Sequence, residues 1–349
     1  MLKPPANLRE TVMLFGHFRP KLGISDLFAQ VDWSGVQRRQ LIHAFLDRPP
    51  ASAEETLEGP GFDACAEALL LFASPEFRAG LAPRLLQAFP AKRRLLFVHI
   101  PKAAGTDFMA AMRGALPHVG NELAEPALVS TDMLARRLAR LAATIKQSET
   151  IFMGGHIPLA WFLDQRLYRF NDRLTAILRH PRDICVSMAN YIVHSFRQDP
   201  QLVRPDTRSW SGVLGLGYEQ IADMDSQALA LAVVARRGMQ PVNPICSLLG
   251  DGTASGTLAT LMRAPIEITS MAQYSAWLRD GWGLERTKRV NASDQVIGWD
   301  DLSQWQKSQV EAGCQEDYPV YEAAMSCLAR SGALSVTGPE VARYAAGAT

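Results

Sequence analysis

The chain contains 349 residues, of which 48% are hydrophobic and 20% are charged, and its formal net charge is +1. This composition excludes disorder for most of the chain, and the near-zero charge predicts neither a nucleic-acid partner nor attraction to an anionic membrane. The five cysteines are scattered and never spaced as Cys-x-x-Cys, which argues against a disulfide framework and a structural zinc site. Because there is no signal-peptide pattern and no apolar run long enough to span a membrane, we expect a soluble cytoplasmic protein without a membrane span.

Residues 1–90 are predicted to be helical. Apolar residues recur at three- and four-residue spacings over 25–45 and 64–72. Ser74-Pro75-Glu76 is a helix-start signal, because proline at the first helical position loses no hydrogen bond. The stretch 48–60 is rich in Pro, Ala and Glu and is predicted to be a loop. We therefore expect a helical N-terminal region, whose role the sequence leaves open.

Strands and helices alternate after this region. Short apolar runs predict strands buried on both faces, and each is followed by a turn and a helical pattern; they span 95–100, 150–153 and 173–178. This alternation favours an α/β core with a parallel sheet, in which ligands collect at the carboxyl ends of the strands. We expect an α/β domain over 91–330 and a peripheral tail over 331–349.

The segment 96–106, LFVHIPKAAGT, runs from a strand through a short loop into a helix. Gly105 lets the backbone approach a bound anion closely, and the free N–H groups at the helix start favour a phosphate or sulfate. Lys102 adds a mobile positive charge. An ordinary strand-to-helix turn with a surface lysine is the alternative. The segment is not a Walker A loop, because Gly-x-x-x-x-Gly-Lys-[Ser/Thr] does not occur in the chain.

This loop resembles the 5′-phosphosulfate-binding loop of sulfotransferases, particularly the membrane-type and bacterial carbohydrate branch with the signature His-Ile-Pro-Lys-x-x-Gly-Thr. That family transfers a sulfuryl group from 3′-phosphoadenosine 5′-phosphosulfate (PAPS) and releases adenosine 3′,5′-bisphosphate (PAP). The resemblance extends from residue 94 to about residue 325 and implies the sulfotransferase fold, a P-loop-like parallel sheet flanked by helices. It also implies that the donor's 5′-phosphosulfate is held by Lys102, Ala103, Ala104, Gly105 and Thr106.

A second motif, RHPRDICVS over 179–187, resembles the family's 3′-phosphate site. There an arginine ends a strand and a serine follows eight residues later on the next helix, which implies Arg179 and Ser187 as ligands. The chemistry agrees, because a phosphate dianion suits a planar guanidinium and a hydroxyl donor. A plain strand-to-helix turn is the alternative. Three weaker resemblances follow in the family's order, at 243–250, 289–293 and 317–322.

His156 is the best candidate for the base that accepts the acceptor's proton. It follows a predicted strand and two glycines, and an ordinary histidine pKa of about 6.5 leaves the ring largely neutral at cytosolic pH. The resemblance implies a catalytic histidine at this place, whereas the alternative is a histidine that only caps the turn. His99 is predicted to pack in the core. The chain departs from the family at Gly154, where a second histidine is common, and at Asp107, which we exclude from the binding set, and it has Ser270 where glutamate is common.

These features predict a PAPS-dependent sulfotransferase in which Lys102 neutralises the leaving phosphate and His156 acts as the base, with no metal. The resemblance implies a carbohydrate or other hydroxyl-bearing small molecule as the acceptor. One alternative is a P-loop-type nucleotide kinase or phosphotransferase, which binds ATP and magnesium. Another is a catalytically silent glycan-binding protein. The oligomeric state and the acceptor's hydroxyl position are left open.

Overall fold

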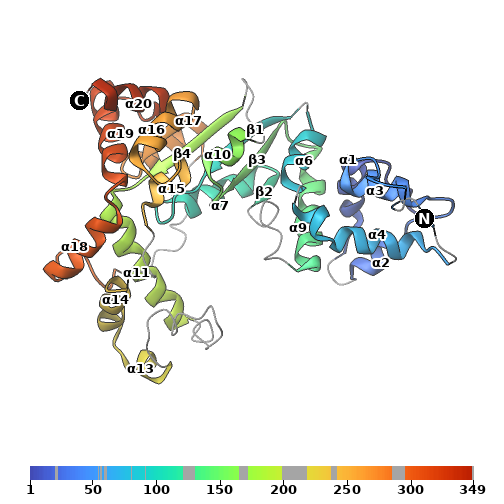
Figure 1. The fold of residues 1–349 in the computed structure, drawn as a ribbon, viewed down its shortest axis with the longest axis horizontal. Coiled ribbons are helices and arrows are strands. Elements are labelled where there is room, and N and C mark those ends of the chain that lie inside the picture. The colour runs from blue at the N-terminus through green and yellow to red at the C-terminus, as the bar shows by residue number, and fades with distance from the viewer. Residues whose placement is uncertain are drawn as a thin grey trace. The chain divides into compact units, whose positions relative to one another are not determined.

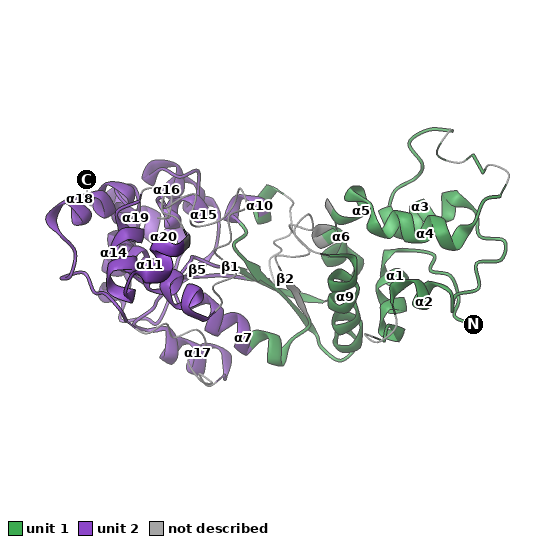
Figure 2. Cartoon of the chain, turned by 90° about the horizontal axis from the view of Figure 1, so that it is seen from below, with its two compact units in different colours: residues 1–97, 112–157, 162–173 green, residues 98–111, 158–161, 174–349 purple. Residues whose placement is uncertain are grey.

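The alternation of apolar runs and helical patterns produces an α/β fold in the computed structural model (Figure 1). The described residues are 1–19, 23–53, 55, 57–58, 61–79, 81–90, 92–120, 130–164, 172–198, 218–236, 242–284 and 295–347. The chain divides into two compact units (Figure 2). Unit 1 comprises 1–97, 112–157 and 162–173, and unit 2 comprises 98–111, 158–161 and 174–349.

Unit 1 combines helices with three strands in the order β2-β3-β1, of which β2 and β3 pair in parallel. Its elements are α1 (Leu8–Leu14), η1 (Phe15–His17), α2 (Ile24–Phe28), α3 (Arg38–Leu46), α4 (Ala64–Ala73), α5 (Pro75–Ala79), α6 (Leu81–Ala88), β1 (Arg93–Val98), β2 (His118–Gly120), α9 (Thr131–Ile145) and β3 (Thr150–Gly155). Helices α7 (Gly105–Ala115) and α10 (Leu159–Asp164) have residues in both units.

The N-terminal helices are held together by an aromatic core. Its rings are fully buried, with centroids 4.9–6.3 Å apart, and belong to Phe15, Phe28, Phe45, Phe72 and Phe77. Large aromatic side chains contribute most of the apolar area that stabilises such a small helical cluster. The same cluster explains why residues 1–90 fold as helices despite a composition without long amphipathic repeats.

The helical prediction for residues 1–90 is confirmed, with two refinements. The stretch 25–45 forms two helices, α2 and α3, separated by a turn, and α5 begins at Pro75 as the start signal predicts. The Phe77 N–H donates to the Ser74 hydroxyl (3.1 Å), which satisfies one of the free donors of that helix start. Helices α1 and η1 pack against α9, so the N-terminal region belongs to unit 1 and is not a separate body.

Unit 2 contains strands in the order β4-β5-β6, with β4 and β5 parallel and β5 and β6 antiparallel. Its elements are β4 (Arg173–Leu178), α11 (Pro181–Gln198), α13 (Tyr218–Asp223), α14 (Ser226–Val234), α15 (Pro244–Leu249), α16 (Ala254–Arg263), β5 (Glu267–Ser270), α17 (Tyr274–Trp282), α18 (Gln304–Gly313), α19 (Asp317–Ser331), β6 (Val336–Thr337) and α20 (Gly338–Gly347). The buried face of α11 packs with α14 and α18 in one apolar core.

The prediction of a peripheral tail over 331–349 is wrong for residues 336–347. β6 extends the strand ladder, and the Gly338 N–H donates to the Ile266 carbonyl (2.8 Å). Helix α20 packs against α16 and α19, and Val341 is fully buried. A two-residue strand and a helix rich in small residues carry too little periodicity to reveal this packing in the sequence.

Asp317 anchors the N-terminus of α15 from the start of α19. Its fully buried carboxylate accepts hydrogen bonds from the N–H groups of Ile245 (3.2 Å) and Cys246 (2.8 Å). The first N–H groups of a helix lack partners within the helix, so this carboxylate satisfies two of them. Burial raises the pKa of Asp317 to about 6.

We expect the free energy of unfolding of Asp317→Asn, measured relative to that of the parent chain, to rise with pH between about pH 4 and 6, although asparagine loses one of the two acceptors for the α15 N–H groups. The folded state holds the Asp317 proton more tightly than the unfolded chain between about pH 4 and 6. The stability that this proton confers is therefore complete below about pH 4 and is lost as the pH rises through 6, by about 1–3 kcal/mol. Urea unfolding of both proteins from pH 4 to 7 measures this difference.

The exposed Asp300 provides the control, since Asp300→Asn should leave the pH dependence of unfolding unchanged. A constant difference between the parent and Asp317→Asn over this pH range would show that Asp317 titrates normally in the folded state.

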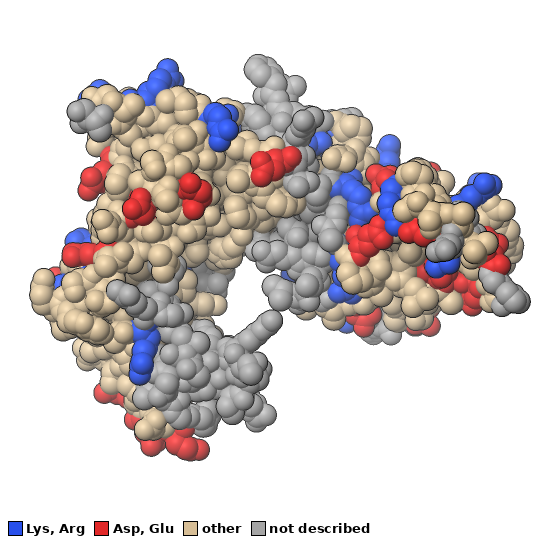
Figure 3. All heavy atoms as spheres, in the orientation of Figure 1, with Lys and Arg blue, Asp and Glu red and all other residues tan. Residues whose placement is uncertain are grey.

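The described residues contain no helix that is both long and apolar enough to cross a membrane. On the face of the molecule drawn in Figure 3, basic and acidic side chains are interspersed over the N-terminal helices. On this face, therefore, the N-terminal helices present no broad basic patch.

Candidate functional site

The loop between β1 and α7 has a strained backbone. β1 ends at Val98, two residues earlier than predicted, because His99 and Ile100 belong to the loop. Lys102 and Ala104 have φ angles of 58° and 60°, in the left-handed region. This region costs residues with a Cβ about 1–2 kcal/mol each, and such strain is concentrated at binding and active sites. The loop is therefore a candidate site on its backbone geometry as well as on its sequence.

The strained turn leaves several backbone donors available at the start of α7. The N–H groups of Ala104, Gly105 and Thr106 donate to no other residue in the described part of the chain. The Ala104 carbonyl accepts the first helical hydrogen bond, from the Phe108 N–H (3.1 Å). Free donors at the positive end of a helix dipole form an anion-binding arrangement.

Ala103 lies in the middle of the turn. Its side chain is fully buried, and its N–H donates to the Ile100 carbonyl (3.3 Å) inside the turn. The residues on either side of it, Lys102 and Ala104, are in the αL region. The role of Ala103 in ligand binding stays a prediction from the sequence.

Arg179 is brought against the loop although it is 77 residues away in sequence. It follows the last residue of β4, and its Nη1 donates to the Lys102 carbonyl (3.0 Å). The αL conformation of Lys102 turns that carbonyl toward Arg179. Arg179 therefore both fixes the loop and places a guanidinium beside the Lys102 ammonium.

Lys102 is a largely buried cation without an acidic partner among the described residues. Burial and the neighbouring Arg179 lower its pKa to about 8. No carboxylate of the described chain lies within ion-pair distance of its Nζ. A buried ammonium without a counter-ion, close to a second cation, is stabilised by a multiply charged anion.

Ser187 lies on α11, on the same face of the helix as a residue that contacts the loop. Tyr191 is four residues further along α11 and therefore shares that face. The Lys102 Nζ lies 4.0 Å from the centroid of the Tyr191 ring, in cation–π geometry. The Ser187 hydroxyl is half-buried and has no hydrogen-bond partner in the described residues, so it can act as a donor on the side of Lys102.

Tyr191 is the site residue that the sequence did not reveal. The signal that could have found it is the i, i+4 spacing from Ser187, which places an aromatic side chain on the candidate ligand-binding face of α11. That spacing alone is common on helices. Only the packing of the loop against α11 shows that Tyr191 contacts Lys102.

His99 lies close to Gly105 and is half-buried, so it is less enclosed than the core histidine that the sequence predicts. A Cβ added at Gly105 would overlap the His99 ring, so the glycine is required by close packing and not by its φ angle. Gly105 therefore leaves room for the His99 ring, and its N–H has no acceptor in the described residues and can donate to a ligand.

We expect Gly105→Ala to lower the thermal stability by about 1–3 kcal/mol and to abolish anion binding, because the loop must move away from His99. The double variant Gly105→Ala/His99→Ala should recover most of the stability. Gly114→Ala on the same helix is the control. An added Cβ there meets nothing within 4 Å, so the variant should be neutral or slightly stabilising. Thermal unfolding of the four proteins tests this, and a neutral Gly105→Ala would contradict it.

His156 follows β3 immediately and is exposed. It belongs to unit 1, whereas Lys102, Arg179 and Ser187 belong to unit 2. Its assignment as the base therefore stays a prediction from the sequence.

The departures from the family pattern have local structural roles. Asp107 is buried in the first turn of α7, where a carboxylate is favourable for the helix dipole. The Thr269 hydroxyl donates to the Leu334 carbonyl (2.6 Å), and the Ser270 hydroxyl accepts from the Gln273 N–H (3.2 Å). Neither hydroxyl at the end of β5 replaces a missing acid–base group.

Two of the three weaker resemblances meet in the fold, since 243–250 and 317–322 are joined by the Asp317 contacts to α15. The third, at 289–293, lies outside the described residues. The chain just beyond it is held by Asn190 of α11, whose Oδ1 accepts from the N–H groups of Val296 (3.0 Å) and Ile297 (2.9 Å). These segments are therefore structural parts of unit 2.

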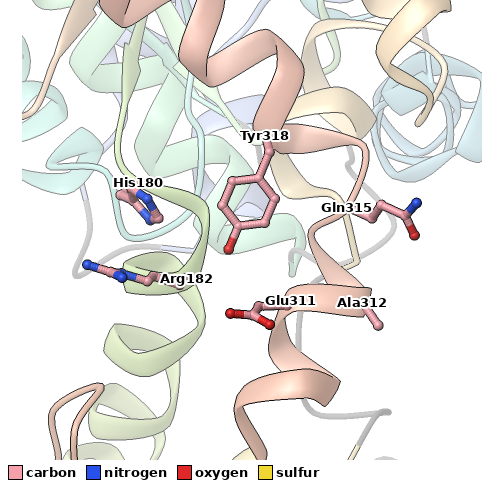
Figure 4. A pocket seen from close by; sticks show the side chains of 6 residues that line it. All are labelled: His180, Arg182, Glu311, Ala312, Gln315 and Tyr318. Carbon is pink, nitrogen blue, oxygen red and sulfur yellow. The ribbon is translucent and has the colours of Figure 1, made fainter.

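A pocket of about 520 Å³ opens elsewhere in unit 2 (Figure 4). Its lining residues are His180, Arg182, Glu311, Ala312, Gln315 and Tyr318. The lining carries both charges, and the His180 ring packs edge-on against Tyr318 and Tyr321. Burial and the nearby Arg182 lower the pKa of His180. Because Glu311 lies in the same lining as Arg182, this pocket has no excess of positive charge to favour an anion.

Comparisons with known proteins add no relative: no family model matches the chain, and no curated protein or solved structure is significantly similar to it. The described residues also contain no group of three or more His, Cys, Asp or Glu side chains placed to hold a metal ion. The functional argument therefore rests on the geometry of the loop, α11 and Arg179.

Proposed function

We propose that this protein is a PAPS-dependent sulfotransferase that transfers a sulfuryl group to an acceptor hydroxyl and releases PAP. The observation that carries the proposal is the closeness of two cations at the start of α7, since Arg179 donates to the Lys102 carbonyl (3.0 Å) and lowers the pKa of the Lys102 ammonium. PAPS is a matching ligand because it carries several negative charges in two groups, at its 5′ and 3′ ends.

The donor set fits the 5′-phosphosulfate. Three N–H groups with no acceptor in the described residues, those of Ala104, Gly105 and Thr106, lie where the loop enters α7, and the Thr106 hydroxyl and the Lys102 ammonium belong to the same segment. Lys102 stabilises the charge that develops on the leaving phosphate, which is an electrostatic contribution of the kind that dominates many enzyme mechanisms. Arg179 and Ser187 are the proposed ligands of the 3′-phosphate.

His156 is proposed to take the proton from the acceptor hydroxyl as that oxygen attacks sulfur and the bond from sulfur to the bridging phosphate oxygen breaks. The acceptor class, a saccharide or another hydroxyl-bearing small molecule, rests on the resemblance of 96–106 to carbohydrate sulfotransferases.

Calorimetric titration with PAP and, separately, with ATP and magnesium tests the proposal. We expect PAP to bind and ATP to bind at least tenfold more weakly, and we expect Lys102→Ala to bind PAP about 10- to 100-fold more weakly than the parent chain. The matched control is Lys307→Ala, which removes another lysine of unit 2 that lies over an aromatic ring, that of Trp299 (5.8 Å). This control should bind PAP like the parent chain.

The other outcomes separate the alternatives. Preference for ATP would indicate a phosphotransferase and overturn the proposal. Absence of binding to either nucleotide would favour the silent glycan-binding protein, which would then be tested with immobilised oligosaccharides.

A further inference from the structure

The Lys102 ammonium is held by an aromatic ring instead of a carboxylate. Its Nζ lies 4.0 Å from the Tyr191 ring centroid, close enough for a substantial cation–π interaction. The Tyr191 side chain is 36% exposed, so one side of the ring remains at the surface while Lys102 is largely buried against the other. The contact joins the loop to α11 within unit 2.

A ring face and a carboxylate have different consequences for an anion-binding lysine. A carboxylate would neutralise the ammonium and would repel the phosphate that must replace it. The quadrupole of a ring stabilises the positive charge but adds no net negative charge, so the field at the start of α7 stays positive. This is useful here because burial and Arg179 both disfavour the charged form of Lys102.

We propose that Tyr191 is a positioning residue that presents the Lys102 ammonium to the anionic ligand through its ring face, a role that rests on the proposed function. The Tyr191 hydroxyl has no hydrogen-bond partner among the described residues, so the ring and not the hydroxyl is the functional part. Phenylalanine at position 191 should therefore retain the role.

A fluorination series tests this with little change in shape. Tyr191 is replaced by Phe and by Phe carrying one, two and three fluorine atoms, which progressively weaken the negative ring face. The first readout is acetylation of Lys102 by acetic anhydride at pH 8, measured by mass spectrometry relative to Lys307 in the same sample. The second is the calorimetric Kd for PAP at pH 8.

We expect Tyr191→Phe to match the parent chain within about twofold. Across the fluorinated series, acetylation of Lys102 should rise and PAP affinity should fall by about fivefold. The reason is that a weaker ring face lowers the pKa of Lys102 by about one unit, and at pH 8 most of the Lys102 side chains then lose their proton. Acetylation of Lys307 should stay constant, since its ring partner is Trp299.

The two readouts separate failure of this inference from failure of the proposed function. If the acetylation of Lys102 is the same in all the fluorinated variants, the proposed role of Tyr191 is overturned, whether or not PAP binds. Acetylation that follows fluorination while the Kd for PAP stays constant shows a ring contact without a role in binding, which also overturns it. If no protein of the series binds PAP, the parent chain included, the proposed function fails, whereas a fluorination-dependent acetylation still establishes the ring contact.

Discussion

PAP affinity is expected to fall by up to tenfold per pH unit above about pH 8. The reason is that burial and Arg179 lower the pKa of Lys102 to about 8, so the free protein loses the ammonium as the pH rises through that value. Below it the lysine is charged and the affinity should be level. Lys102→Ala should bind PAP about 10- to 100-fold more weakly at pH 7, the range for a lost charge-assisted contact, and should show no break near pH 8. Calorimetry from pH 6.5 to 9.5 measures both effects.

Lys102→Arg is the control for this pH dependence. A guanidinium stays protonated throughout the range, so PAP binding by this variant should not change between pH 7 and 9.5, whatever its absolute affinity. If the PAP affinity of Lys102→Arg or Lys102→Ala still falls above about pH 8, another group is responsible for the titration. The proposed role of Lys102 in binding PAP would then be wrong.

Replacement of His156 by alanine is expected to lower turnover by about 10²- to 10⁴-fold while leaving the Kd for PAP within about twofold of the parent value. The physical reason is that a base acts only on the acceptor hydroxyl as it attacks sulfur, and it makes no contribution to holding the nucleotide. Transfer of radiolabelled sulfate from PAPS to a panel of neutral and uronic-acid-containing oligosaccharides measures turnover. Added imidazole should restore part of the lost rate.

The control for His156 is His17→Ala, which removes another exposed histidine of unit 1 and should leave turnover unchanged. Unchanged turnover in His156→Ala would exclude this residue as the base. Loss of both turnover and PAP binding would indicate a structural role for His156, such as capping the turn that follows Gly154 and Gly155.

The positions of the central elements follow from the sequence because their signals are local. The apolar run over 173–178 is β4 with the predicted bounds, and the run over 150–153 lies in β3. Buried strands of a parallel sheet are continuous apolar runs, and turn residues end them abruptly. The change from strand to loop to helix around Lys102, and the placement of Arg179 after a strand, could both be read from residue order alone.

The prediction was less accurate where the packing depends on distant residues. The tail over 336–347 joins unit 2 through β5. This result depends on a strand edge 68 to 70 residues earlier in the chain, which sequence patterns do not specify.

By itself, the sequence determined that the chain is an α/β protein with a basic loop at the start of a helix and an arginine that follows another strand. Local hydrophobic periodicity and turn chemistry carry that information. Only the tertiary structure decided that Arg179 grips the Lys102 carbonyl, that His99 requires a glycine at 105, and that Tyr191 lies under the Lys102 ammonium. These contacts join residues far apart in the chain, and a charge gains its shifted pKa only from the burial and neighbours that folding supplies.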